Sequence, residues 1–182
     1  MLRDACHASE FTDPRGPVDL FGEVTAPGGA LCGIVVHGWR EPEHSVYLTR
    51  DGAAFRAVVR VHGLSPEPPY HEAPLDQNIG AMLQRICNAV VATHSQCHHY
   101  GRDGTYYLMQ VSTDGQDQRT ALTWSPKPGT DSDLVVTMFL ALRAYVGAPP
   151  DLQLSAYNTF YTEAYEAYNA LGLFETAHGA RR

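Results

Sequence analysis

The feature that most constrains the fold is an amphipathic pattern over residues 74–96. Apolar residues recur there at intervals of three and four, namely Ile79, Met82, Leu83, Ile86, Val90 and Val91. This spacing is typical of an α-helix with one apolar face. Pro74 fits the first turn of such a helix, and Asp76 would place negative charge near its positive end. Strand-like segments precede and follow it in the sequence, which predicts a helix packed across a sheet.

The length and composition indicate a single soluble domain. The chain has 182 residues, of which 44% are hydrophobic and 18% are charged, so it can bury a core without metals or disulfides. No apolar run approaches the roughly 18 residues that a membrane span requires. The formal net charge is -7, and Lys127 is the only lysine. These values exclude a broad nucleic-acid surface, which needs clustered basic side chains.

The N-terminus and the cysteines both indicate a reducing compartment. Residues 1–15 lack a continuous apolar segment and do not have the pattern of a secretory signal, so a cytoplasmic location is expected. The four cysteines are scattered and form no C-x-x-C pair: Cys6, Cys32, Cys87 and Cys97. We expect free thiols, with Cys32 in a strand and Cys87 in the first helix as small core residues.

Six segments have the composition of β-strands: residues 20–26, 30–39, 44–49, 54–62, 105–112 and 119–125. The dipeptide Asp51-Gly52 favours a tight turn and predicts a hairpin between the third and fourth of them. Residues 63–74 contain four prolines, so they are predicted to form neither a central strand nor a helix interior. They are interpreted as a crossover into the first helix.

Two more helices are predicted in the last third of the chain. Residues 130–133 offer capping side chains for a helix over residues 134–146. A third helix is predicted over residues 152–171, ending at Gly172.

This order of elements favours an α+β domain, because strands and helices do not alternate. We expect a mainly antiparallel sheet of about five to six strands with the first two helices on one face. The third helix is expected at an edge of the sheet or extended from it. The predicted organisation is an irregular arm (1–19), an α+β domain (20–150), a C-terminal helix (151–174) and a tail (175–182).

Residues 93–99 are the strongest candidate for a metal site. His94 and His98 are four residues apart, so a continuing helix would place both imidazoles on one face, and Cys97 adds a thiol. The segment lacks an H-E-x-x-H core and a second Cys/His pair at finger-like spacing. Histidines at a helix C-terminus also suit the helix dipole, and we prefer this interpretation. No metal is therefore predicted.

Common motifs of catalysis and nucleotide binding are missing from the sequence. It contains neither the serine-hydrolase pattern G-x-S-x-G nor the glycine patterns of phosphate-binding loops. His37, at the end of an apolar strand, is more typical of a polar residue at a sheet margin than of a base. We predict no catalytic residue and no cofactor, although catalytic groups are assembled in space and not in sequence.

The most unusual feature is a series of tyrosines in the C-terminal helix. Tyr157, Tyr161, Tyr165 and Tyr168 follow spacings of four, four and three and form one stripe, which we call the tyrosine stripe. In one interpretation the stripe docks the helix on the domain. In the other it is partly exposed and binds a partner, because tyrosine is enriched in interface hot spots.

These features favour a non-enzymatic protein-binding domain that acts through an acidic or tyrosine-bearing surface. Small acidic α+β proteins without catalytic motifs include many immunity and inhibitor proteins, so we expect an inhibitor, immunity or adaptor protein whose partner is a toxin or effector. One alternative is a small hydrolase or metal-dependent enzyme centred on His94 and His98, with His37 or His62 as a further group. Another is a structural subunit of a homo-oligomer joined through the C-terminal helix.

Overall fold

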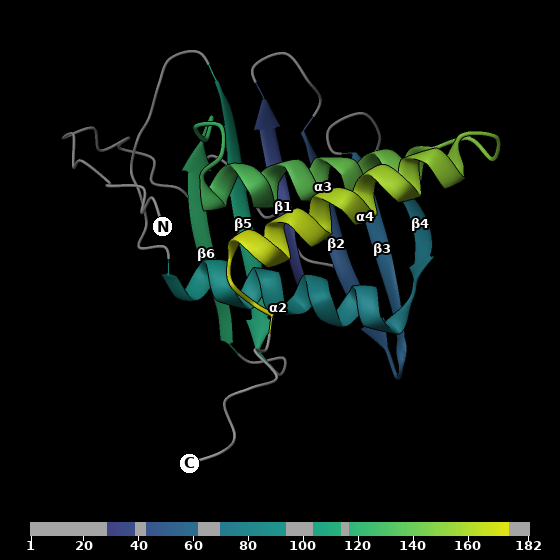
Figure 1. The fold of residues 1–182 in the computed structure, drawn as a ribbon, viewed down its shortest axis with the longest axis horizontal. Helices are drawn as coiled ribbons and strands as arrows, with labels where there is room; N and C mark the ends of the chain where they lie inside the picture. Colours follow the sequence, from purple (N-terminus) through teal and green to yellow (C-terminus); the bar gives the residue numbers. More distant parts are fainter. Residues whose placement is uncertain (1–28, 39–42, 62–69, 94–103, 114–116, 175–182) are drawn as a thin grey trace.

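An antiparallel sheet forms the centre of the structure, a computed structural model that describes residues 29–38, 43–61, 70–93, 104–113 and 117–174 (Figure 1). Within these ranges six strands are hydrogen-bonded in the order β4-β3-β2-β1-β5-β6, each antiparallel to its neighbours. The strands are β1 (Ala30–Gly38), β2 (His44–Asp51), β3 (Ala54–Val61), β4 (Tyr70–Leu75), β5 (Thr105–Thr113) and β6 (Asp117–Trp124). The sheet matches the prediction in type and size.

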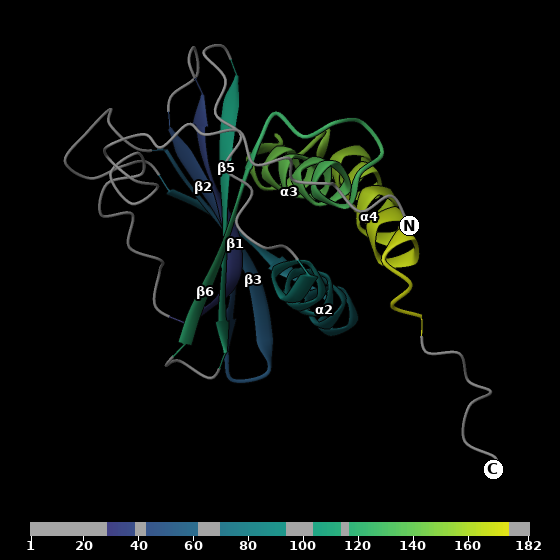
Figure 2. The same cartoon turned by 90° about the vertical axis from the view of Figure 1, so that its left-hand side faces the viewer.

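Three helices lie on one side of this sheet. They are α2 (Gln77–Thr93), α3 (Asp131–Gly147) and α4 (Gln153–Ala170). Figure 2 shows α2 and α3 over the same face of the sheet, with α4 on their outer side. The predicted α+β fold with two helices on one face is therefore confirmed. The third helix packs mainly on α3 and also contacts α2, so it lies over the helical layer and not at an edge of the sheet.

The hairpin predicted around Asp51-Gly52 joins β2 and β3. The two strands pair from His44 opposite Val61 to Asp51 opposite Ala54. Gly52 has a φ of 59°, which glycine adopts without the steric strain of a Cβ. The pair β5 and β6 is also present as predicted, with β6 at one edge of the sheet.

Strand β4 is an element that the sequence pattern did not predict. It lies within the proline-rich stretch and includes Pro74, so the assignment of Pro74 to the first turn of a helix is wrong. Proline is tolerated here because β4 is an edge strand that pairs only with β3. Helix α2 begins at Gln77 instead, and the Asn78 N–H donates to Oδ1 of Asp76 at 2.8 Å. Asp76 therefore caps α2.

Several predictions concern parts of the chain outside the described residues. These are the arm over residues 1–19, the strand over 20–26, the tail over 175–182, Cys6, His62, and the segment with His94, Cys97 and His98. They stay predictions.

The main core lies between the sheet and the helices. The predicted apolar face of α2 is buried there through Ile79, Leu83, Ile86 and Val90. Cys32 of β1 and Cys87 of α2 are free, buried thiols in the same core, as predicted. Burial raises the pKa of the Cys87 thiol well above its ordinary value, and the neighbouring Cys32 adds to the shift. Cys87 is therefore a neutral core residue at physiological pH.

Helix α2 approaches the sheet closely at Gly80. A Cβ at this position would collide with the ring of Phe55 on β3. Both residues are buried, so the ring has little room to move away. A glycine inside a helix interior usually weakens the helix, and here it allows the helix and the Phe55 ring to pack together.

On the opposite face of the sheet, Tyr47 spans a neighbouring strand. Tyr47, Gly33 and Gln110 lie in register on β2, β1 and β5. The Tyr47 hydroxyl donates to Oε1 of Gln110 at 2.6 Å, and both side chains are buried. A Cβ at Gly33 would collide with the Tyr47 ring, so the missing side chain makes this crossing possible. Burial raises the pKa of Tyr47 to about 12.

We expect Gly80→Ala to destabilise the protein even though alanine is the better helix former. Alanine gains about 1 kcal/mol over glycine in a helix interior. The added Cβ would collide with the Phe55 ring, and overpacking of a core typically costs about 1–3 kcal/mol or more. Urea denaturation should show a net loss in the free energy of unfolding.

Gly147→Ala in α3 is the matched control for this variant. A Cβ at Gly147 meets nothing within 4 Å, so only the helix propensity changes. Its free energy of unfolding should stay the same or rise by up to about 1 kcal/mol. If both variants were stabilised equally, the predicted collision between a Cβ at position 80 and the Phe55 ring would be refuted.

Tyr47 should make the protein lose stability at alkaline pH. Folded Tyr47 keeps its proton up to about pH 12, whereas in the unfolded chain its pKa is near the ordinary value of 10.0. Its contribution is complete below pH 10 and is lost as the pH rises toward 12, by about 3 kcal/mol in total. Denaturant unfolding measured between pH 9 and 12 tests this decline.

In the Tyr47→Phe protein this part of the alkaline decline in stability should be absent. The control is Tyr161→Phe, which changes an exposed tyrosine and should show the same decline as wild type. At neutral pH the Tyr47→Phe protein should be less stable by about 1–3 kcal/mol, because Gln110 Oε1 loses its donor. An alkaline decline of the same size in Tyr47→Phe and wild type would refute the assignment.

Candidate protein-binding surface

Helix α4 is held in place by signals at both ends and by one buried face. Pro149 and Pro150 precede it, and the Leu152 N–H donates to the Pro149 carbonyl at 3.0 Å. Gly172 has a φ of 67° and ends the helix where the sequence predicts. Phe160, Ala164 and Ala167 are fully buried along its inner face. The small alanine side chains allow close packing on the helices below.

The tyrosine stripe is divided between the interior and the surface. Tyr168 is buried with 9% exposure, and Tyr157 is partly buried against the core. Tyr161 and Tyr165 keep 43% and 46% of their surface exposed. The structure thus combines features of both interpretations, because both ends of the stripe pack on the domain while its middle faces outward.

The rings of the stripe contact one another along the helix. Tyr157 and Tyr161 have ring centroids 6.5 Å apart and an angle of 28° between their planes. Tyr161 and Tyr165 follow at 6.4 Å and 20°. Spacings of four residues on a helix produce this row, because such side chains lie one above the other. Each exposed ring is therefore supported by a neighbouring ring.

Residues outside the stripe anchor both ends of this row. Tyr145 of α3 packs edge-on against Tyr157 at 5.3 Å, and Phe174 packs edge-on against Tyr165 at 5.4 Å and Tyr168 at 5.1 Å. Arg85 of α2 places its guanidinium 5.3 Å from the Tyr168 ring centroid and donates to the Leu173 carbonyl at 3.0 Å. These contacts connect the row to both α2 and α3.

Several other residues beside the tyrosine stripe are not among those predicted from the sequence pattern. Leu154 is three residues before Tyr157, is 73% exposed, and was detectable because it continues the spacing of the stripe. Phe174 is 44% exposed and follows Gly172, so nothing in its local pattern indicates that the chain folds back toward Tyr165. Arg85 lies on α2, far from the tyrosines in the sequence, and no sequence pattern predicts its contact with Tyr168.

Acidic residues of α4 lie apart from the tyrosines. Helical periodicity places Glu163 and Glu166 on the opposite flank of the helix from Tyr161 and Tyr165. The α4 sequence contains no lysine or arginine. The tyrosine-bearing surface and the acidic side chains of α4 are therefore separate features.

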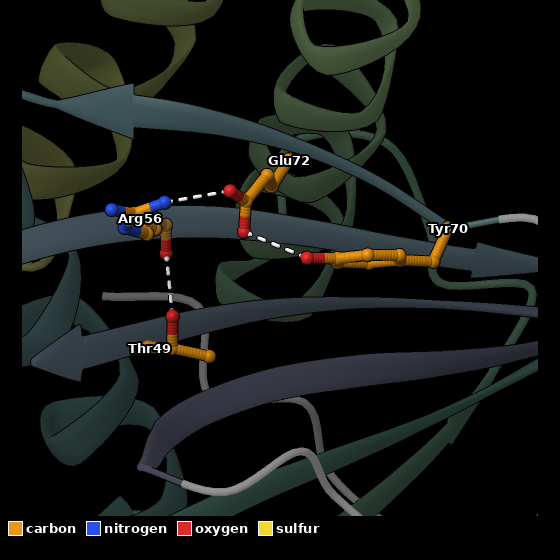
Figure 3. Close-up of polar contacts among 4 residues, drawn as sticks. All are labelled: Thr49, Arg56, Tyr70 and Glu72. Atoms are coloured by element: carbon orange, nitrogen blue, oxygen red, sulfur yellow. Dashed lines mark hydrogen bonds and ion pairs between the residues drawn. The ribbon is translucent and has the colours of Figure 1, made fainter.

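A polar cluster occupies the far face of the sheet near the β4 edge (Figure 3). Arg56 and Glu72 form an ion pair at 2.6 Å, and the Tyr70 hydroxyl donates to Oε2 of Glu72 at 3.1 Å. The Thr49 hydroxyl donates to the Arg56 carbonyl at 3.4 Å. The hydrogen bond to Glu72 raises the pKa of Tyr70, which is exposed. Exposed pairs contribute about 0–1 kcal/mol, so this cluster adds modestly to the pairing of β3 with β4.

No group of three metal-ligating side chains occurs among the described residues. His37 is the one member of the proposed enzyme alternative within them, and its Nδ1 lies 3.7 Å from Oε2 of Glu43. This contact joins the end of β1 to the start of β2. The other members of that alternative, His62, His94 and His98, lie outside the described residues, so it stays a prediction.

Comparison with known proteins gives no relative from which a function can be transferred: no family model matches the chain, and no curated protein matches it. Within the described residues, no helix has the length and apolar character needed to cross a membrane.

Substitutions should separate the docking residues of α4 from the exposed ones. Phe160→Ala should lower the free energy of unfolding by about 3–5 kcal/mol, because Phe160 is fully buried. Tyr161→Ala combined with Tyr165→Ala should lower the free energy of unfolding by less than about 2 kcal/mol, because it removes only contacts between partly exposed rings on the helix surface. Denaturant unfolding of both variants makes the comparison. A double variant as unstable as Phe160→Ala would assign these tyrosines to docking alone.

Proposed function

We propose that this chain is a non-enzymatic protein-binding domain whose contact surface is centred on Tyr161 and Tyr165. The observation that carries the proposal is the exposure of two neighbouring aromatic side chains on a helix whose inner face is fully buried. Leu154 and Phe174 add exposed apolar area on the same helix and just beyond its end. Tyrosine combines such area with a hydroxyl that tolerates water, which suits a surface exposed before a partner binds.

The ring contacts support this proposal on energetic grounds. Binding normally costs about 0.5–1.5 kcal/mol for each flexible side chain that becomes fixed. Tyr161 is stacked between Tyr157 and Tyr165, and Phe174 supports Tyr165 from the other side. These rings have lost part of their freedom already, so a partner would find a partly organised surface.

The proposed class is an inhibitor, immunity or adaptor protein that acts in the cytoplasm on a toxin or effector protein. Its support is the acidic composition, the α+β fold and the lack of catalytic motifs in the sequence. In this role the tyrosine-bearing surface would cover a functional surface of the partner. A homo-oligomer joined through α4 is the competing role for the same side chains.

Affinity capture from native lysate tests the proposal. Wild type should retain one partner in a defined ratio, and Tyr161→Ala with Tyr165→Ala should weaken that complex by at least about a hundredfold, because each hot-spot residue contributes about 2 kcal/mol or more. The affinity is then measured with the purified partner.

Thr159→Ala with Thr162→Ala is the matched control, since both side chains are exposed on α4 and neither belongs to the row of aromatic rings. This control should leave binding unchanged. Circular dichroism must show that all variants stay folded. Equal binding by the tyrosine variant and wild type would reject the proposed surface, and self-association of wild type alone would favour the homo-oligomer.

A further inference from the structure

A groove of about 510 Å³ lies between α3 and the sheet, apart from the tyrosine-bearing surface. The described residues that line it are Val36, Thr105, Tyr107, Leu140, Arg143, Ala144 and Gly147. Its volume falls within the range of about 300–1,000 Å³ that is common for small-molecule sites. The residues come from β1, β5 and α3, so rigid elements form its walls.

Regular geometry explains why these residues share one groove. Leu140, Arg143, Ala144 and Gly147 are spaced by three and four residues and form one stripe along α3. Val36 and Tyr107 are cross-strand partners on β1 and β5. Thr105 is two residues before Tyr107, so it faces the same side of the sheet.

Small side chains on α3 keep the groove open. Ala144 and Gly147 project little or no side chain into it, and a Cβ at Gly147 would meet nothing within 4 Å. Longer residues at these two positions would fill the space against Val36 and Tyr107. The groove is therefore a consequence of residue size on one stripe of the helix.

The chemistry of the lining combines one cation and other polar groups with a few apolar side chains. Arg143 carries a guanidinium with five N–H donors, so it can bind an anion in addition to its existing contact. The Thr105 backbone is fixed by two hydrogen bonds with Ser125, at 3.2 and 3.0 Å, which hold this residue at the groove. Leu140 and the Tyr107 ring provide the apolar contact area, since only 3% of Val36 is exposed.

We propose that this groove binds a small organic anion with an apolar body. The carboxylate or sulfonate is held by the Arg143 guanidinium, whose planar fork matches two anionic oxygens. The apolar body lies along Leu140 and Tyr107, with Thr105 at the same side of the groove. This site does not depend on the proposed protein-binding function, because none of its lining residues belongs to α4.

A pair of fluorescent probes tests the site. Anilinonaphthalene sulfonate carries an anion on an apolar body, and N-phenylnaphthylamine has the same body without the anion. Titration of the full chain should show one site for the sulfonate, with weaker binding of the neutral probe. Amide NMR shifts should locate the sulfonate at β1, β5 and the second half of α3. Failure of the sulfonate to bind would overturn the proposal.

Substitutions connect the binding to the groove. Arg143→Gln should weaken the sulfonate about tenfold or more and change the neutral probe by less than about twofold. Ala144→Phe should fill the groove and block the binding of both probes. If the Ala144→Phe protein does not fold, Gly147→Leu is used in its place, with the same expected result. Arg85→Gln and the Tyr161/Tyr165 double alanine variant are controls that should bind like wild type. Sulfonate affinity that is unchanged by Arg143→Gln, or reduced equally by Arg85→Gln, would overturn the assignment.

Discussion

Burial of the apolar side of the sheet is the interaction on which the rest of this structure depends. Helices α2 and α3 cover that side, and the outer surface of these two helices in turn receives α4. Phe160, Ala164 and Ala167 pack there without exposure. Because the inner face of α4 is fixed in this way, the direction of every other side chain on it is fixed too. The exposure of Tyr161 and Tyr165 follows from core packing.

The sequence predicted those parts of the fold that have a regular period or a local turn signal. The apolar spacing of α2 identified its buried residues, and Asp51-Gly52 identified the β2-β3 hairpin. Strand β4 escaped prediction because prolines argue against a strand in general, and only the sheet order shows that this strand lies at an edge. Periodicity also grouped the four tyrosines correctly, but which side of the stripe is buried depends on where α4 docks, and no local pattern encodes that.

The two proposed sites differ in how the sequence reveals them. The tyrosine-bearing surface follows from one helix and one residue type, so spacing alone drew attention to it. The groove at Arg143 requires α3 and two strands that meet only in the folded chain, and its lining includes residues as ordinary as Ala144 and Gly147. Arg85 and Phe174 are similar cases, since tertiary packing alone brings them to the tyrosine rings.

The crossing of Tyr47 over Gly33 has a consequence for strand register and for sequence variation. A shift of β1 by two residues would bring Leu31 or Val35 beneath the Tyr47 ring, where Gly33 already leaves no room for a Cβ. Glycine thus marks the one register in which the aromatic ring can reach Gln110 on β5. A Cβ at position 33 would also collide with the Val46 carbonyl oxygen of β2, so the backbone as well as the ring requires glycine there, whatever the size of residue 47.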